Sequence, residues 1–172
     1  MRHNKFIGWD TFLSMVDQVQ RVSPWLSRQI AKHASEWPYW YSGLRIKDWR
    51  DNQVWVHLPL SFRNAIEGEV CLGHMQLGAD LCMRLLLLRY RQEFPFRYRV
   101  MSSRGEIHHM VNQSVDFRFS ISQTEWERLR LDLSRDSRGE AEFACFAYLT
   151  DGRLAGTFTF HLAFTLEKFL PA

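Results

Sequence analysis

A carboxylate lies inside an apolar stretch of this sequence, where its charge needs an explanation. Asp80 follows the segment Val70 to Ala79, and the chain continues into an apolar run from Leu81 to Leu88. We expect a turn that opens directly into an apolar helix, with Asp80 two turns inside it. An uncompensated charge on an apolar helix face is costly to bury. A carboxylate held there suits a general base or a nucleophile.

The start of the same helix offers the second group that acyl chemistry needs. The backbone N–H groups near Leu72, Gly73 and His74 would carry the positive end of the helix dipole and could hold a developing oxyanion. Asp80 lies seven residues beyond Gly73, roughly 10 Å along a helix, which is too far for both to touch one carbonyl group. If both act on one substrate, they must come from different chains.

Each of these residues also has a structural interpretation. Asp80 and Arg84 are four residues apart and could form a helix ion pair worth about 0.2 to 0.5 kcal/mol. Asn64 could orient substrate or water, or could serve turn formation before Gly68. Gln76 could face a substrate or solvent. These alternatives stay open at the level of sequence.

Thiol and metal chemistry are less favoured. Cys71 would stand at a helix N-terminus, where thiol pKa values fall, but no histidine partner is placed by local sequence. His74 could donate to an oxyanion or lie at the surface. His108 and His109 are adjacent, and in a strand they would point to opposite faces, so a shared metal is not expected. We expect neither a metal nor a cofactor.

Composition narrows the class of protein. The chain has 172 residues, 46% hydrophobic and 15% aromatic, which predicts one globular domain with a sizeable core. Its 22 basic and 19 acidic residues are dispersed, so a nucleic-acid partner is not expected. No apolar stretch approaches the roughly 20 residues of a membrane-spanning helix, and the three cysteines lack zinc-site spacing. We expect a cytoplasmic protein with reduced thiols and no membrane association.

The elements that must position Asp80 can be read from hydrophobic periodicity. Residues 1–38 predict a helical extension that packs on the domain, and residues 39–172 predict the domain itself. Before the central helix, we expect strands over 40–49 and 53–61. After it we expect strands over 96–103, 107–122, 140–149 and 154–166, with a short helical turn that begins at Thr124 and ends before Ser134. The Asp-Gly pair at 151–152 predicts the turn of the last hairpin.

This order gives an α+β fold, an antiparallel sheet wrapped around one long helix, and it resembles the hotdog fold. The central segment resembles the motif of hotdog thioesterases of the phenylacetyl-CoA and hydroxybenzoyl-CoA type, and most closely a bacterial branch of them. The matching residues are Asn64, Gly68, Val70, Gly73 and Asp80. The chain departs from the motif at Glu69, Cys71 and Leu72, and it has one extra residue after Asn64.

The resemblance implies an acyl-CoA thioesterase that forms a homodimer or a dimer of dimers, with its sites at the subunit interface. It implies Asp80, Gly73 and Asn64 as catalytic residues, with Leu72, His74, Gln76 and Arg84 around the substrate. The alternative is a protein that binds acyl-CoA without hydrolysing it. A hotdog hydratase is disfavoured because Leu85 stands where a second catalytic group would be expected.

Overall fold

The computed structural model describes residues 42–50, 52–61 and 64–167. The predicted extension over residues 1–38, and the domain boundary at its end, lie outside these ranges. The elements are β1 (Arg45–Trp49), β2 (Gln53–Leu58), β3 (Ala65–Ile66), β4 (Glu69–Val70), α3 (Leu72–Glu93), β5 (Phe96–Ile107), β6 (Val115–Ser120), α4 (Gln123–Asp136), β7 (Arg138–Leu149) and β8 (Leu154–Leu166).

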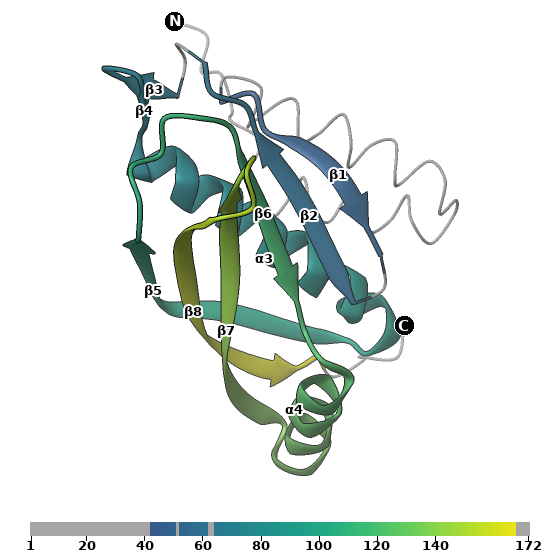
Figure 1. Cartoon of the computed structure of the whole chain (residues 1–172). Helices are drawn as coiled ribbons and strands as arrows, with labels where there is room; N and C mark the ends of the chain where they lie inside the picture. Colours follow the sequence, from purple (N-terminus) through teal and green to yellow (C-terminus); the bar gives the residue numbers. More distant parts are fainter. Residues whose placement is uncertain (1–41, 51, 62–63, 168–172) are drawn as a thin grey trace, which may run out of the picture.

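One six-stranded sheet organises the described chain. Its order is β1-β2-β6-β7-β8-β5, and every neighbouring pair is antiparallel. The helix α3 packs against β2, β6 and β7 on one face, which we call the inner face (Figure 1). Along β2, Val54, Val56 and Leu58 are buried while the alternate residues are half-buried or exposed, as a strand covered on one face requires. The α+β prediction is confirmed.

The helix α3 is 22 residues long and supplies much of the core. Its buried residues run almost continuously from Leu81 to Leu88, interrupted by Arg84. At its C-terminal end Tyr90 stacks on Trp126 of α4, with ring centroids 4.3 Å apart. The predicted apolar helix is therefore present, and it begins directly after the Cys71 turn.

Several predicted boundaries were wrong. The strand predicted over 107–122 begins at Val115, because residues 108–114 form a loop whose His108 N–H donates to the Ala155 carbonyl at 2.8 Å. The strand predicted to run to Ser61 ends at Leu58, directly before Pro59, which cannot donate to a ladder. The last hairpin was predicted correctly, with Gly152 at φ 86° in its turn.

The helix α4 is longer than the predicted turn that would end before Ser134. Ser122 caps it, since the Ser122 hydroxyl accepts from the Glu125 N–H at 3.2 Å and Glu125 accepts in return from the Ser122 N–H at 2.9 Å. Trp126, Leu129 and Leu133 then recur at helical spacing and are buried. This buried stripe carries the helix on to Asp136.

A short hairpin that periodicity did not predict precedes α3. β3 and β4 pair over two residues each, and Glu67 and Gly68 connect them with φ values of 53° and 84°. Two successive positive φ values are the conformation of a type I′ turn, which favours glycine at its second position. The hairpin delivers the chain to the start of α3.

The contact between α3 and the sheet is closest at Gly78. A methyl group added there would lie 2.5 Å from Cε2 of Phe117, a buried ring on β6. We expect Gly78→Ala to destabilise the protein by about 1 to 3 kcal/mol, because overpacking outweighs the helix propensity gained. Gly73→Ala is the matched control on the same helix, since nothing lies within 4 Å of its added methyl group. Urea unfolding of both variants measures the difference, and equal midpoints would contradict it.

A candidate acyl-transfer site at the start of the central helix

The first turn of α3 presents unpaired backbone donors. Cys71 is the N-cap residue and makes no side-chain capping bond, while its carbonyl accepts from His74 N–H at 3.0 Å and from Met75 N–H at 3.2 Å. Among the described residues, the N–H groups of Leu72 and Gly73 have no acceptor. Gly73 is exposed and has open space beside it. These two N–H groups, and not that of His74, are free to bind an oxyanion.

Asp80 lies on the same helix, at a position that solvent reaches. Its side chain is 24% exposed, and its Oδ2 accepts from the Arg84 Nε at 2.6 Å. The i, i+4 ion pair weighed from the sequence is therefore present. Within the described part of the chain, Oδ1 of Asp80 accepts no hydrogen bond. One oxygen thus remains free to take a proton.

Asp80 belongs to a polar stripe on α3. Gly73, Gln76, Asp80 and Arg84 recur at three- and four-residue spacing, and each is exposed or half-buried, while Met75, Ala79 and Met83 are buried. Leu72 is the first residue of the helix and is also exposed. The side chain of His74 is half-buried. Helical spacing places Gly73, Gln76, Asp80 and Arg84 on one side of α3, whereas His74 points away from that side.

The side-chain amide of Asn64 is turned into the protein. Asn64 is fully buried, and its Nδ2 donates to the carbonyls of Ser42 at 2.8 Å and Pro59 at 2.7 Å. Its Oδ1 accepts from the Ser61 N–H at 3.1 Å, and its own carbonyl accepts from the Cys71 N–H at 2.9 Å. These contacts tie the segment before α3 to the strand β2 and to the helix N-cap. Asn64 therefore positions the turn that leads into α3.

Two of the three thiols pack in the core. Cys71 is half-buried, whereas Cys82 and Cys145 are fully buried on α3 and β7. Burial raises the pKa of the Cys82 thiol well above its ordinary value, and a hydrogen bond with Cys145 raises it further. Cys82 therefore stays protonated and is no nucleophile. No group of three or more metal-ligating side chains occurs in the described ranges.

Three arginines on the strands could bind a phosphate group, and each of them contacts another side chain. Arg118 lies on the outer face of the sheet, 4.6 Å from the ring centroid of Trp55. Arg97 pairs with Glu167 at 3.1 Å, and Arg104 pairs with Glu106 at 2.8 Å. A single chain does not gather them into one anion site.

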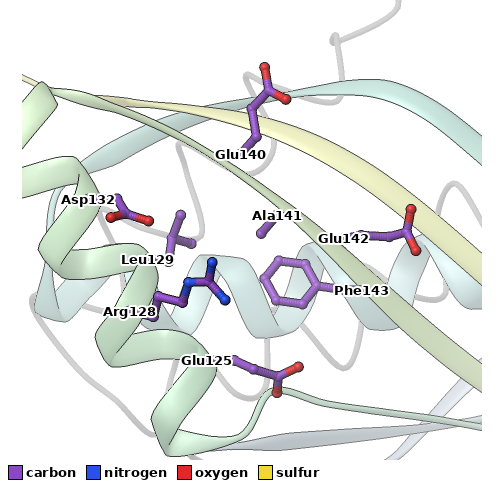
Figure 2. Close-up of a pocket in the computed structure, with 8 residues that line it drawn as sticks. All are labelled: Glu125, Arg128, Leu129, Asp132, Glu140, Ala141, Glu142 and Phe143. Atoms are coloured by element: carbon purple, nitrogen blue, oxygen red, sulfur yellow. The ribbon is translucent and has the colours of Figure 1, made fainter.

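A cavity of about 260 Å³ lies away from this helix end, between α4 and β7. Figure 2 shows Glu125, Arg128 and Asp132 along α4 and Glu140 and Glu142 along β7, on either side of the space. Two of its carboxylates already have partners, Glu125 with Ser122 and Glu140 with His161. The cavity contains none of the residues predicted to do chemistry.

Comparison with solved structures shows which fold this is. A protein of unknown function from Pseudomonas aeruginosa, described as a "Probable Thioesterase", matches with a TM-score of 0.74 at 14% identity, over 81% of this chain and 96% of that one. A thioesterase from Haemophilus influenzae matches with a TM-score of 0.59 at 10% identity, over 83% and 94%. A Chlorobaculum tepidum protein of unknown function matches with a TM-score of 0.65 at 11% identity, over 92% and 96%.

These likenesses show an α+β fold that the chain shares with solved structures described as thioesterases. No family model and no curated protein matches the chain. Within the described ranges, no helix has the length and apolarity needed to cross a membrane.

Proposed function

We propose that this protein hydrolyses acyl-CoA thioesters in a site shared by two copies of the chain. The proposal rests on two features of α3. Asp80 is a carboxylate that solvent reaches, and the backbone N–H groups of Leu72 and Gly73 have no acceptor among the described residues. Thioester hydrolysis needs these two functions, a base and an oxyanion site. The likeness to thioesterase structures supports the same chemistry.

In the proposed reaction, the free oxygen of Asp80 takes a proton from water as the water oxygen attacks the thioester carbon. The Leu72 and Gly73 N–H groups of the partner subunit hold the carbonyl oxygen as it becomes negative. The C–S bond then breaks, and the proton on Asp80 passes to the departing thiolate. Arg84 holds the other carboxylate oxygen and fixes the direction of the free one.

The edge strand β5 supports the assembly that such a site needs. β5 stands last in the sheet order, and across the described residues no strand pairs with its outer edge. It is twelve residues long, which is enough to pair with a second copy by a full ladder of backbone hydrogen bonds. We propose that two chains meet along β5 and form a homodimer, which can pair again into a dimer of dimers.

One observation favours a second function, the binding of acyl-CoA without hydrolysis. The short Arg84 contact occupies one oxygen of Asp80, and an ion pair of this kind also occurs where a carboxylate has no catalytic role. On that account the protein binds acyl-CoA and leaves the thioester intact. Release of free thiol from short, medium, long and aromatic acyl-CoA esters separates the two functions. Turnover of any ester supports the hydrolase, and tight binding without turnover supports the binding protein.

A further inference from the structure

The strand β7 has an unpaired edge along its first half. Its ladder with β6 ends at the pair formed by Cys145 and Phe119, whereas its ladder with β8 continues as far as Arg138. Over residues 138–143, β7 therefore pairs with a strand on one side only. Across the described residues, no backbone hydrogen bond reaches this stretch from any segment other than β8. A strand edge left open in this way can accept another strand.

The edge is open because the chain turns into α4 directly after β6. The strand β6 ends at Ser120, and Ser122 caps a helix that begins at Gln123. The helix then packs across β7, where a methyl group added at Gly139 would lie 3.1 Å from Cδ1 of Leu129. The position that a longer β6 would fill, beside the first half of β7, is left to the cavity between α4 and β7.

This cavity lies along the open edge itself. On β7 it is lined by four consecutive residues, Glu140, Ala141, Glu142 and Phe143. Adjacent residues of a strand point to opposite faces, so a cavity that touches all four adjoins the edge of the strand. Figure 2 shows the two glutamates on one side of the β7 ribbon and the other two residues on the side toward α4. An extended segment seated in the cavity would continue the sheet.

The side chains along this edge form two rows of different chemistry. Phe143 opposes the buried Phe160 of β8, so Phe143 and Ala141 form an inner, apolar row. Glu140 and Glu142 form an outer row and are exposed. Directly opposed side chains of paired strands interact, and opposite charges are favoured there. A segment that pairs with this edge should therefore alternate basic and apolar residues.

The rest of the lining favours the same positive charge. On α4 the cavity is lined by Glu125 and Asp132, so that four of its residues are carboxylates and Arg128 is its one cation. Glu142 makes no hydrogen bond or ion pair with another side chain within the described ranges. The carboxylates are spread over two elements, so spaced cations match them better than a single metal ion does. Lysine and arginine side chains on an extended backbone are spaced in this way.

We propose that the open edge of β7 binds an extended peptide segment in which basic and apolar residues alternate. The segment adds a strand beside residues 138–143, a length of about 20 Å that accommodates about six residues. Its basic side chains lie opposite Glu140 and Glu142, and its apolar side chains lie beside Ala141 and Phe143. The groups proposed for thioester hydrolysis take no part, so the two proposals stand or fall separately.

A peptide of three Lys-Val repeats, labelled with fluorescein, is the probe. Fluorescence polarisation at low salt, with the full-length protein, should show saturable binding. A peptide of three Glu-Val repeats should bind at least about tenfold more weakly, because its charges repel the outer row. A peptide with three lysines followed by three valines has the same composition without the alternation. It should also lose at least about tenfold, because it cannot place each kind of side chain on its own row.

One charge reversal on the protein tests the location of the site. Glu142→Lys should weaken the Lys-Val peptide at least about fivefold, because a favourable cross-strand pair becomes a repulsive one. Glu127→Lys is the matched control, since Glu127 is an exposed carboxylate of α4 that does not line the cavity. Its affinity should stay within about twofold of wild type, as expected for a distant, independent site. Thermal unfolding first establishes that both variants fold.

Backbone pairing is tested with two further Lys-Val peptides. Alternate N–H groups of a strand point to opposite sides, so N-methylation of one alternate set removes the donors that face β7 and methylation of the other set leaves them. One methylated peptide should lose binding at least about tenfold and the other should stay within about threefold. Equal losses would contradict strand addition.

Three other results would overturn the proposal. The first is the absence of saturable binding, and the second is equal binding of the basic and the acidic peptides. The third is an equal effect of Glu142→Lys and Glu127→Lys. If Glu142→Lys changes the number of subunits while no peptide binds, a second copy of the chain occupies the edge and the peptide proposal fails.

Discussion

Asp80→Asn should reduce thioester hydrolysis by at least about two orders of magnitude, the effect of removing a positioned general base. The substitution preserves side-chain shape and can still accept a hydrogen bond from Arg84, but an amide cannot take the proton from water. The loss should appear in kcat, because the substrate contacts are unchanged. Free-thiol release under saturating ester, with wild type and variant side by side, measures it.

Asp116→Asn is the control for this result. Asp116 is also a half-buried carboxylate in an ion pair, here with His57 at 2.6 Å, but it lies on the outer face of the sheet. Burial by itself would raise the pKa of Asp116, yet hydrogen bonds from His57 and Lys47 outweigh this and lower it. We expect full activity at neutral pH from this variant. If both asparagine variants keep wild-type turnover, Asp80 is not the base.

Asn64→Asp should strongly destabilise the protein. The amide nitrogen that now donates to two backbone carbonyls would become a carboxylate oxygen that faces them, in a position with no exposure to solvent. A buried, unpaired charge costs several kcal/mol, so we expect a loss of at least about 3 kcal/mol or failure to fold at all. Asn64→Ala leaves the same carbonyls and the Ser61 N–H without this partner, at about 1 to 3 kcal/mol for each group left unsatisfied.

Urea unfolding ranks these variants, with Asn112→Asp as the control because Asn112 is an exposed residue of the loop before β6. The control should stay within about 0.5 kcal/mol of wild type. A stable Asn64→Asp protein with altered turnover would instead place the Asn64 side chain at the substrate.

The local signals in the sequence predicted the central helix well and the loops around it poorly. The mainly apolar residues from Leu81 to Leu88, together with the helical spacing before them, predicted a buried helix, and Asp80 next to them could be recognised as unusual before any coordinates. The loop over 108–114 escaped prediction because its path depends on contacts with residues far away in the sequence, namely Ala155 and Val70. A strand was predicted in this region, but the residue at which β6 begins is set by those contacts.

The candidate residues on the central helix were predictable from the sequence. Asp80, Gly73 and Gln76 are related by helical spacing, which sequence displays directly. Which residues of β5 face the core was not predictable, because it follows from a register shift between Val100 and Ser102 that depends on pairing with β8. Asn64 was recognised as a candidate from its motif, but its buried amide contacts depend on tertiary structure.

A subunit-mixing experiment tests the shared site most directly. Asp80→Asn removes the base, and Gly73→Pro removes a backbone donor in the first turn of α3, where proline is tolerated and open space surrounds the residue. Each variant alone should be inactive. After the two are mixed and allowed to exchange subunits, half of the dimers pair one of each and regain one intact site of two, so we predict recovery of about one quarter of wild-type activity. Mixed dimers that form and remain inactive would contradict a site built from Asp80 of one chain and the Gly73 turn of the other.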